Sequence, residues 1–148
     1  MSRGKKSPPR IERVRALKGS RLSIRWIGGV QATVDLAHDL ARYKSLAPLR
    51  QAGEFRRAAV GEGGHSVVWP CGVDIGADSL WRDSLITLGR ADAVTFNDWR
   101  MEHGLTLDQA AEALGLSRRM VAYYSSGEKP VPKTVLLACR GWEAAQAT

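Results

Sequence analysis

The sequence predicts a small α+β domain followed by an all-helical domain. Three observations support this division: segments alternating apolar with basic residues fill the first half, the composition changes near Asp78, and short helices broken by tight turns follow from Ala91. Clustered strands with one or two intervening helices are typical of an α+β domain and not of a doubly wound sheet. We place the domains at residues 10–88 and 89–148, after a basic flexible arm at residues 1–9.

Residues 11–17 and 21–29 alternate apolar with basic side chains, which is the pattern of strands with one buried face. The pair Gly28-Gly29, followed by VQATVDL, is a hairpin signal. A third strand therefore follows this turn. We expect four side chains of these strands to be buried: Ile11, Leu22, Ile24 and Trp26.

Helical spacing comes next, through Leu36, Leu40 and Tyr43, and Pro48 interrupts it. Residues 55–70 then indicate two more strands around the turn at residues 61–64. The segment SLWRDSLITLGR, residues 79–90, predicts a helix that connects the two domains.

The net charge of +7 is concentrated near the N-terminus, where residues 1–25 hold nine Lys and Arg against Glu12 alone. Such an arm suits a polyanion, although a solvated tail explains it equally well. No apolar run approaches the roughly 18 residues of a membrane span, and Cys71 and Cys139 fit no zinc or disulfide spacing. We therefore expect a cytoplasmic protein without a membrane segment.

Two short helices separated by about three residues form the main motif of the second half. Thr106 is placed to cap the first helix and Ser117 the second, because a hydroxyl satisfies amides at a helix N-terminus. Gly115 ends the first helix in a left-handed conformation, and Gly127 closes the second. Val121 and Tyr124 then face inward with Leu114 and Leu116. The outer face is left with Arg118, Arg119, Ala122 and Tyr123.

Two arginines in the first turn of an exposed helix suit the DNA major groove. Arginine can donate two parallel hydrogen bonds to guanine, and the helix N-terminus attracts phosphate. The alternative is a helical hairpin with solvated surface charges.

The second half resembles the phage-repressor or xenobiotic-response-element helix-turn-helix family. The resemblance is carried by R-x-x-x-G-L-T at residues 100–106, A-x-x-x-G-L-S at 111–117 and V-x-x-Y-x-x-G at 121–127, and by KPVPKTVLLACRGW after them. It implies a lambda-repressor-like bundle of four or five helices whose second motif helix enters the major groove. Many members have Gln at the position of Leu107 and Glu at that of Ser125; this chain has neither.

From these features we predict which residues contact DNA. The predicted base readers are Arg118 and Arg119, with Ala122 and Tyr123 near the groove. The predicted phosphate contacts are Ser117, Ser126, Lys129, Arg3, Lys5 and Lys6. Residues 91–148 hold six Lys and Arg against seven Asp and Glu, so the basic arm is expected to supply electrostatic affinity that this domain lacks.

The first half resembles a bacterial family of small α+β domains of unknown function. V-x-x-L-x-x-x-x-L-x-I-x-W-x-G-G at residues 14–29, L-x-x-A-G-x-F at 49–55 and V-x-W-P-x-G-x-D-I at 67–75 carry this resemblance. Its members are sometimes fused to such a helix-turn-helix and sometimes encoded beside a toxin. The resemblance implies no settled activity.

No group of residues supports catalysis, a metal or a cofactor. His38, His65 and His103 are scattered, and the glycines at residues 61–64 lack the Lys-Ser/Thr of a phosphate loop. Cys71 is either a reactive or sensing thiol or, more simply, a small side chain that is buried or partly buried. Asp74 and Asp78 form either a carboxylate pair or a turn with a helix cap. We expect no enzyme and no cofactor.

The sequence thus predicts a sequence-specific double-stranded DNA-binding protein, a repressor-like transcriptional regulator that acts as a homodimer. The alternative is an antitoxin-type interaction module that neutralises a toxin partner and regulates its own operon.

Overall fold

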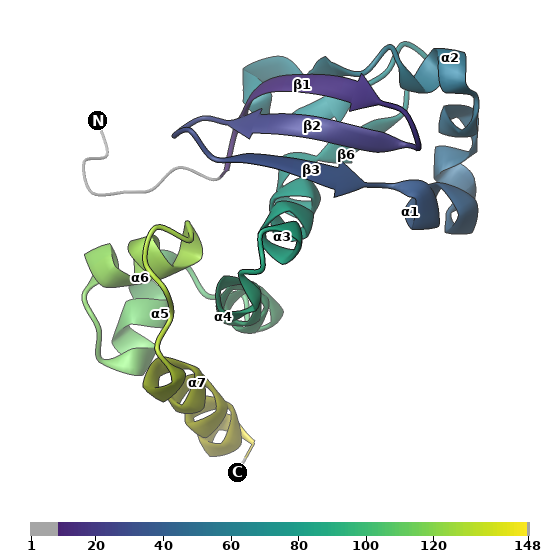
Figure 1. Ribbon diagram of the computed structural model, residues 1–148. Helices are drawn as coiled ribbons and strands as arrows, with labels where there is room; N and C mark the ends of the chain where they lie inside the picture. The colour runs from purple at the N-terminus through teal and green to yellow at the C-terminus, as the bar shows by residue number, and fades with distance from the viewer. Residues whose placement is uncertain (1–8, 148) are drawn as a thin grey trace. The chain divides into compact units, whose positions relative to one another are not determined.

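The computed structural model describes residues 9–147, which form two compact units, residues 9–88 and 89–147 (Figure 1). Most of the predicted basic arm, with Arg3, Lys5 and Lys6, lies outside the described residues. Its role stays a prediction. Within residues 9–147, no helix has the length and apolar character needed to cross a membrane.

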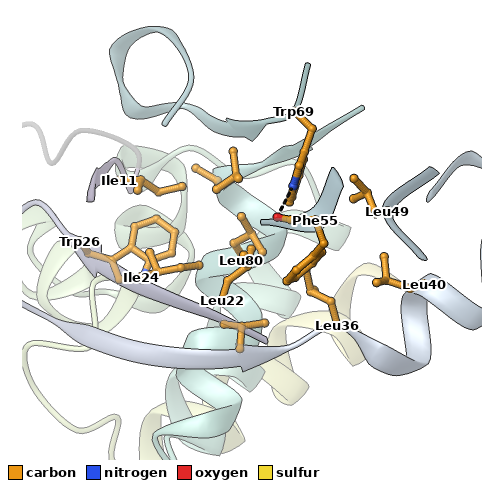
Figure 2. Close-up of a cluster of buried hydrophobic side chains, with 13 residues drawn as sticks. Ile11, Leu22, Ile24, Trp26, Leu36, Leu40, Leu49, Phe55, Trp69 and Leu80 are labelled. Atoms are coloured by element: carbon orange, nitrogen blue, oxygen red, sulfur yellow. Dashed lines mark hydrogen bonds between the residues drawn. The ribbon is translucent and has the colours of Figure 1, made fainter. Parts of the chain in front are cut away.

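The first unit begins with an antiparallel three-stranded sheet of β1 (Ile11–Leu17), β2 (Arg21–Trp26) and β3 (Gln31–Asp35), paired in that order. Gly28 and Gly29 both have positive φ in the turn before β3, as the hairpin signal predicted. The expected buried side chains are confirmed, with exposures of 2% or less for Ile11, Leu22, Ile24 and Trp26. One face of this sheet is therefore part of the core (Figure 2).

Short helical segments connect this sheet to a second one. They are α1 (Ala37–Arg42), the 3-10 helix η1 (Lys44–Arg50), which contains Pro48, α2 (Ala52–Phe55) and the 3-10 helix η2 (Glu62–Gly64). The second antiparallel sheet contains β4 (Ala59–Val60), β5 (Ser66–Val68) and β6 (Asp74–Gly76). The first two of these strands confirm the prediction. Asp74 is not a helix cap, because it lies in β6 and pairs with Val68.

Helix α3 (Ala77–Thr87) belongs to the core of the first unit and is more than a connection. Figure 1 shows it beside β3, and Leu80 is fully buried. The indole Nε1 of Trp26 donates to Ser84 Oγ at 3.1 Å, and that hydroxyl donates to the Leu80 carbonyl at 2.8 Å. The one buried polar side chain of the described core is thus satisfied on both sides. The sequence pattern missed this packing role.

The W-P-x-G signature forms the turn between β5 and β6. The Trp69 ring is buried, and its Nε1 donates to the Phe55 carbonyl at 3.0 Å (Figure 2). The Gly72 amide donates to the Trp69 carbonyl at 2.9 Å, which closes a turn with Pro70 at its second position. Cys71 at the third position is exposed, so its expected burial is wrong. The signature is explained by turn geometry and core packing.

The second unit is helical, as predicted. Within residues 89–147 its helices are α4 (Ala91–Glu102), α5 (Leu107–Leu114), α6 (Arg118–Ser125) and α7 (Lys133–Gln146). Their core is built around Phe96, Trp99, Val121 and Tyr124, and Leu114 and Leu116 pack against it. The inward face predicted for α6 is confirmed at Val121 and Tyr124.

Candidate nucleic-acid interface

The turn between α5 and α6 is fixed by caps on both helices. Thr106 Oγ1 accepts from the Gln109 amide at 3.1 Å, and Gln109 Oε1 accepts from the Thr106 amide at 2.9 Å. This reciprocal pair is a capping box. Gly115 ends α5 with φ of 69°, and Ser117 Oγ accepts from the Met120 amide at 3.1 Å. These local bonds set where α6 begins.

Arg118 lies in the first turn of α6 and is paired with the first turn of α5. Its Nε lies 2.8 Å from Asp108 Oδ1, and the two side chains are 25% and 70% exposed. Arg118 is predicted to lie on the outer face of the helix, and the motif does not indicate Asp108 as its partner. The ion pair holds the guanidinium group at the N-terminal end of α6.

Arg119, Tyr123 and Lys129 form a second cluster, which we call the Tyr123 cluster. Arg119 Nε donates to the Tyr123 hydroxyl at 2.9 Å, one helical turn away. The Lys129 ammonium lies 4.6 Å from the centre of the Tyr123 ring, within the range of a cation–π interaction. The structure therefore brings together three predicted contact residues from α6 and the following loop.

Ala122 does not lie on the outer face. It is only 3% exposed, so a methyl group there is not accessible to a base. Ser125, one turn later, accepts through its carbonyl from Asn97 Nδ2 of α4 at 2.9 Å. The expectation that Ala122 lies on the outer face is therefore wrong. The buried face of α6 includes Ala122 as well as Val121 and Tyr124.

The two predicted serine contacts already have partners within the chain. Ser117 Oγ is engaged in the helix cap. Ser126 Oγ donates to the Tyr123 carbonyl at 3.2 Å and accepts from the Glu128 amide at 3.4 Å. Their hydroxyls shape the ends of α6.

An ion pair that no local pattern indicates, between Arg90 and Asp92, binds the loop that carries Lys129 to the start of α4. Arg90 Nε lies 3.1 Å from Asp92 Oδ1, and its guanidinium also donates to the Gly127 and Lys129 carbonyls. Asp92 Oδ2 accepts from the Val131 amide at 2.7 Å. The hydrogen bond from Arg90 is the main reason that the pKa of Asp92 is lowered to about 2.

The two departures from the helix-turn-helix pattern are accommodated locally. Ser125 stands where many members of the helix-turn-helix family that this half resembles have Glu, and Arg100 donates from Nη1 to the Leu105 carbonyl at 2.9 Å. Leu107 is partly buried and packs against the helical core. The missing Gln and Glu therefore leave the fold of the turn intact.

Other clusters of polar residues lie away from α6. His103 Nε2 is 2.8 Å from Glu143 Oε2, and with Glu102 their ligand atoms lie within 4.8 Å of one another. His103 and Glu143 are 40 positions apart in the chain, so no local pattern indicates this pair. In the first unit, Asp39, Asp74 and Asp83 line a hollow of about 280 Å³. Burial, and next the charge of Asp39, raise the pKa of Asp83.

Comparison with known proteins identifies relatives for both units. A family described as a protein of unknown function, DUF2442, matches residues 11–84. No curated protein matches the chain. Among solved structures the chain is similar to the putative DNA-binding protein NE0471 from Nitrosomonas europaea ATCC 19718, with 36% sequence identity and a TM-score of 0.73. The match covers 96% of this chain and 91% of that one. The chain therefore belongs to the DUF2442 family, whose function is unknown.

Proposed function

We propose that the protein binds double-stranded DNA in a sequence-specific way and acts as a repressor-like transcriptional regulator, not as an enzyme. The observation that carries this proposal is the capped α5–α6 turn, which presents Arg118 and Arg119 in the first turn of α6. The description of NE0471 as a putative DNA-binding protein, at 36% identity over nearly the whole chain, supports it.

In this proposal Arg118 and Arg119 read bases, and contacts within the Tyr123 cluster hold Arg119 and Lys129 in place. Arg118 and Arg119 donate paired hydrogen bonds to guanine O6 and N7 in the major groove. Tyr123 fixes Arg119 through its hydroxyl and supports Lys129 with its ring. Lys129 then contacts phosphate, as do groups at the N-terminus of α6. Ala122 is left out of the reading set because it is buried.

Replacing Arg118 tests base reading. R118A is expected to cost roughly 1–3 kcal/mol on the preferred site, or about 5-fold to about 150-fold in affinity, and to relax preference at one position. Binding sites are selected from random duplexes with the wild type and the variant. K133A, which removes an exposed charge from the start of α7 and lies outside residues 135–142, is the control and keeps the preference. Equal loss by R118A on every sequence would show that Arg118 reads no base.

We also propose a homodimer on an inverted repeat, because one short helix reads only a few base pairs and proteins of this type gain specificity as symmetric dimers. An exposed strand edge of the first unit and the last helix, around residues 135–142, are the candidate surfaces. On α7, Leu137 is 51% exposed. Sedimentation of the protein, free and on DNA, tests this proposal, and a strict monomer in both states would end it.

A second candidate function is an antitoxin-type interaction module for a basic partner protein. The supporting observation is the hollow with three aspartates in a chain of net charge +7, because local negative charge steers a basic partner. Affinity capture with the wild type is compared with a D39N/D83N variant. Recovery of the same proteins by both would count against a role for the hollow, and recovery of none against the module.

A further inference from the structure

The outward face of the first sheet is lined with arginines. Arg13, Arg15, Arg21 and Arg25 are all exposed, and we call this set the arginine face. The antiparallel register places Arg13 opposite Arg25 and Arg15 opposite Ser23. Side chains alternate between the two sides of a strand. The intervening residues Leu22 and Ile24 therefore face the core.

This arrangement concentrates like charge. Arg13 and Arg25 oppose each other directly, and like charges at such positions destabilise a sheet. Two acidic residues offset part of this charge. Glu12, at an irregularity of β1, has its Oε2 3.3 Å from Arg25 Nε, and Asp35 of β3 lies opposite Arg21. Within residues 9–147, Arg13 and Arg15 make no hydrogen bond or ion pair through their side chains. The face therefore has excess positive charge that no described contact explains.

We propose that the arginine face binds the phosphate backbone of duplex DNA, as a sequence-independent anchor for the site on α6. This inference rests on the proposed function. The charges of the two units favour it: residues 89–148 hold seven Lys and Arg against seven Asp and Glu, whereas residues 9–88 hold twelve against eight. Since affinity for DNA depends on phosphate neutralisation, a neutral reading unit needs cations from elsewhere in the chain.

The composition of the face favours phosphates over bases. The other outward positions of β2 and β3 are Ser23, Gln31, Thr33 and Asp35, and the nearest aromatic ring of the strands, Trp26, is buried on the opposite side. Stacking on single-stranded bases needs exposed rings. Arg13 and Arg15, two residues apart on one strand, are separated by about 6.6–6.8 Å along it. The face thus offers a row of cations and no stacking surface.

The test is the salt dependence of binding to a mixed-sequence duplex of 30 base pairs, using the full chain. R13Q/R15Q is expected to lower the slope of log affinity against log salt by about 1.8, since each lost phosphate contact removes about 0.9. Raising the salt from 50 to 200 mM should therefore weaken binding by the variant about 12-fold less than binding by the wild type. Preference among sequences stays unchanged.

Two controls separate contact from net charge. K44Q/R56Q removes two exposed cations of the same unit that lie outside the sheet, and it should keep the slope. R13K/R15K keeps both charges on the face and should also keep the wild-type slope. Equal slopes for R13Q/R15Q and K44Q/R56Q would overturn the inference. An acidic protein would then be the better candidate partner for the arginine face.

The two proposals fail in different ways. If R118A shows no change of sequence preference while R13Q/R15Q lowers the slope, the anchor stands and base reading by Arg118 is wrong. If R118A relaxes preference while R13Q/R15Q keeps the wild-type slope, only the anchor is wrong. A wild type that binds no duplex overturns both.

Discussion

Replacing Asp92 tests whether the Arg90–Asp92 pair stabilises the second unit and the loop that carries Lys129. Asp92 is 24% exposed and receives hydrogen bonds from Arg90 and the Val131 amide. Its pKa falls from the usual 3.8 to about 2. At 1.36 kcal/mol per pH unit, this difference corresponds to about 2 kcal/mol of stability in favour of the charged carboxylate. D92N should lower the free energy of unfolding of this unit by about that amount at pH 7.

The expected pH dependence follows from the direction of the shift. A carboxyl group whose pKa is lower in the folded state stabilises that state above its unfolded pKa, and this contribution is lost as pH falls through the folded value. The difference between wild type and D92N should therefore be full at pH 7, shrink below about pH 4 and be small near pH 2. Urea unfolding followed by resolved NMR signals of residues 89–147 measures it, and signals of residues 9–88 serve as an internal comparison.

A matched control is E112Q, which neutralises an exposed carboxylate on α5 of the same unit. It should leave unfolding almost unchanged at every pH, because exposed carboxylates contribute little. A difference in the free energy of unfolding between wild type and D92N that stays constant from pH 7 to pH 2 would refute the electrostatic explanation. It would then reflect lost packing alone.

Two further predictions concern a glycine and the Tyr123 cluster. G64A should destabilise the first unit by at least about 2 kcal/mol, because φ is +76° and an added Cβ would lie 2.5 Å from the Ile11 carbonyl oxygen. Thermal unfolding compares this variant with G72A, a position that also has positive φ but has open space around the added Cβ. Equal losses of stability in the two variants would exclude the steric cause. Y123F should relax base preference at one position by about 2-fold to 12-fold and keep the salt slope, because it removes only the hydroxyl that fixes Arg119. Y123L should also lower the slope by about 0.9, since Lys129 loses the ring; unchanged binding by both variants would contradict a role for the cluster.

Local patterns accounted for much of the fold. The burial of Leu22 and Ile24 follows from alternation along one strand, and the caps at Thr106 and Ser117 involve partners three residues away. Such interactions are contained in short stretches of sequence. β6 was missed because a three-residue strand that leads directly into α3 is too short to show a period.

Longer-range contacts could not be predicted from the sequence. Arg90 reaches the Gly127 carbonyl across 37 residues, and no local pattern indicates that pairing. Ala122 is 3% exposed, but alanine fits either face of a helix, so the residue type did not indicate its burial. Arg118 and Arg119 were assigned to the start of α6 from the motif, but their partners Asp108 and Tyr123 became clear only in three dimensions.

The turn at Trp69-Pro70-Cys71-Gly72 makes selective chemical labelling practicable. Cys71 is exposed at the tip of this turn, whereas Cys139 is buried. Burial, with Glu143 as a second cause, raises the pKa of the Cys139 thiol to about 11, so this thiol stays protonated and weakly nucleophilic near neutral pH. A maleimide dye should therefore attach to Cys71 alone in the unmodified chain. The natural sequence thus provides a single reporter position on the first unit, and its fluorescence anisotropy can follow that unit during DNA binding without engineered cysteines.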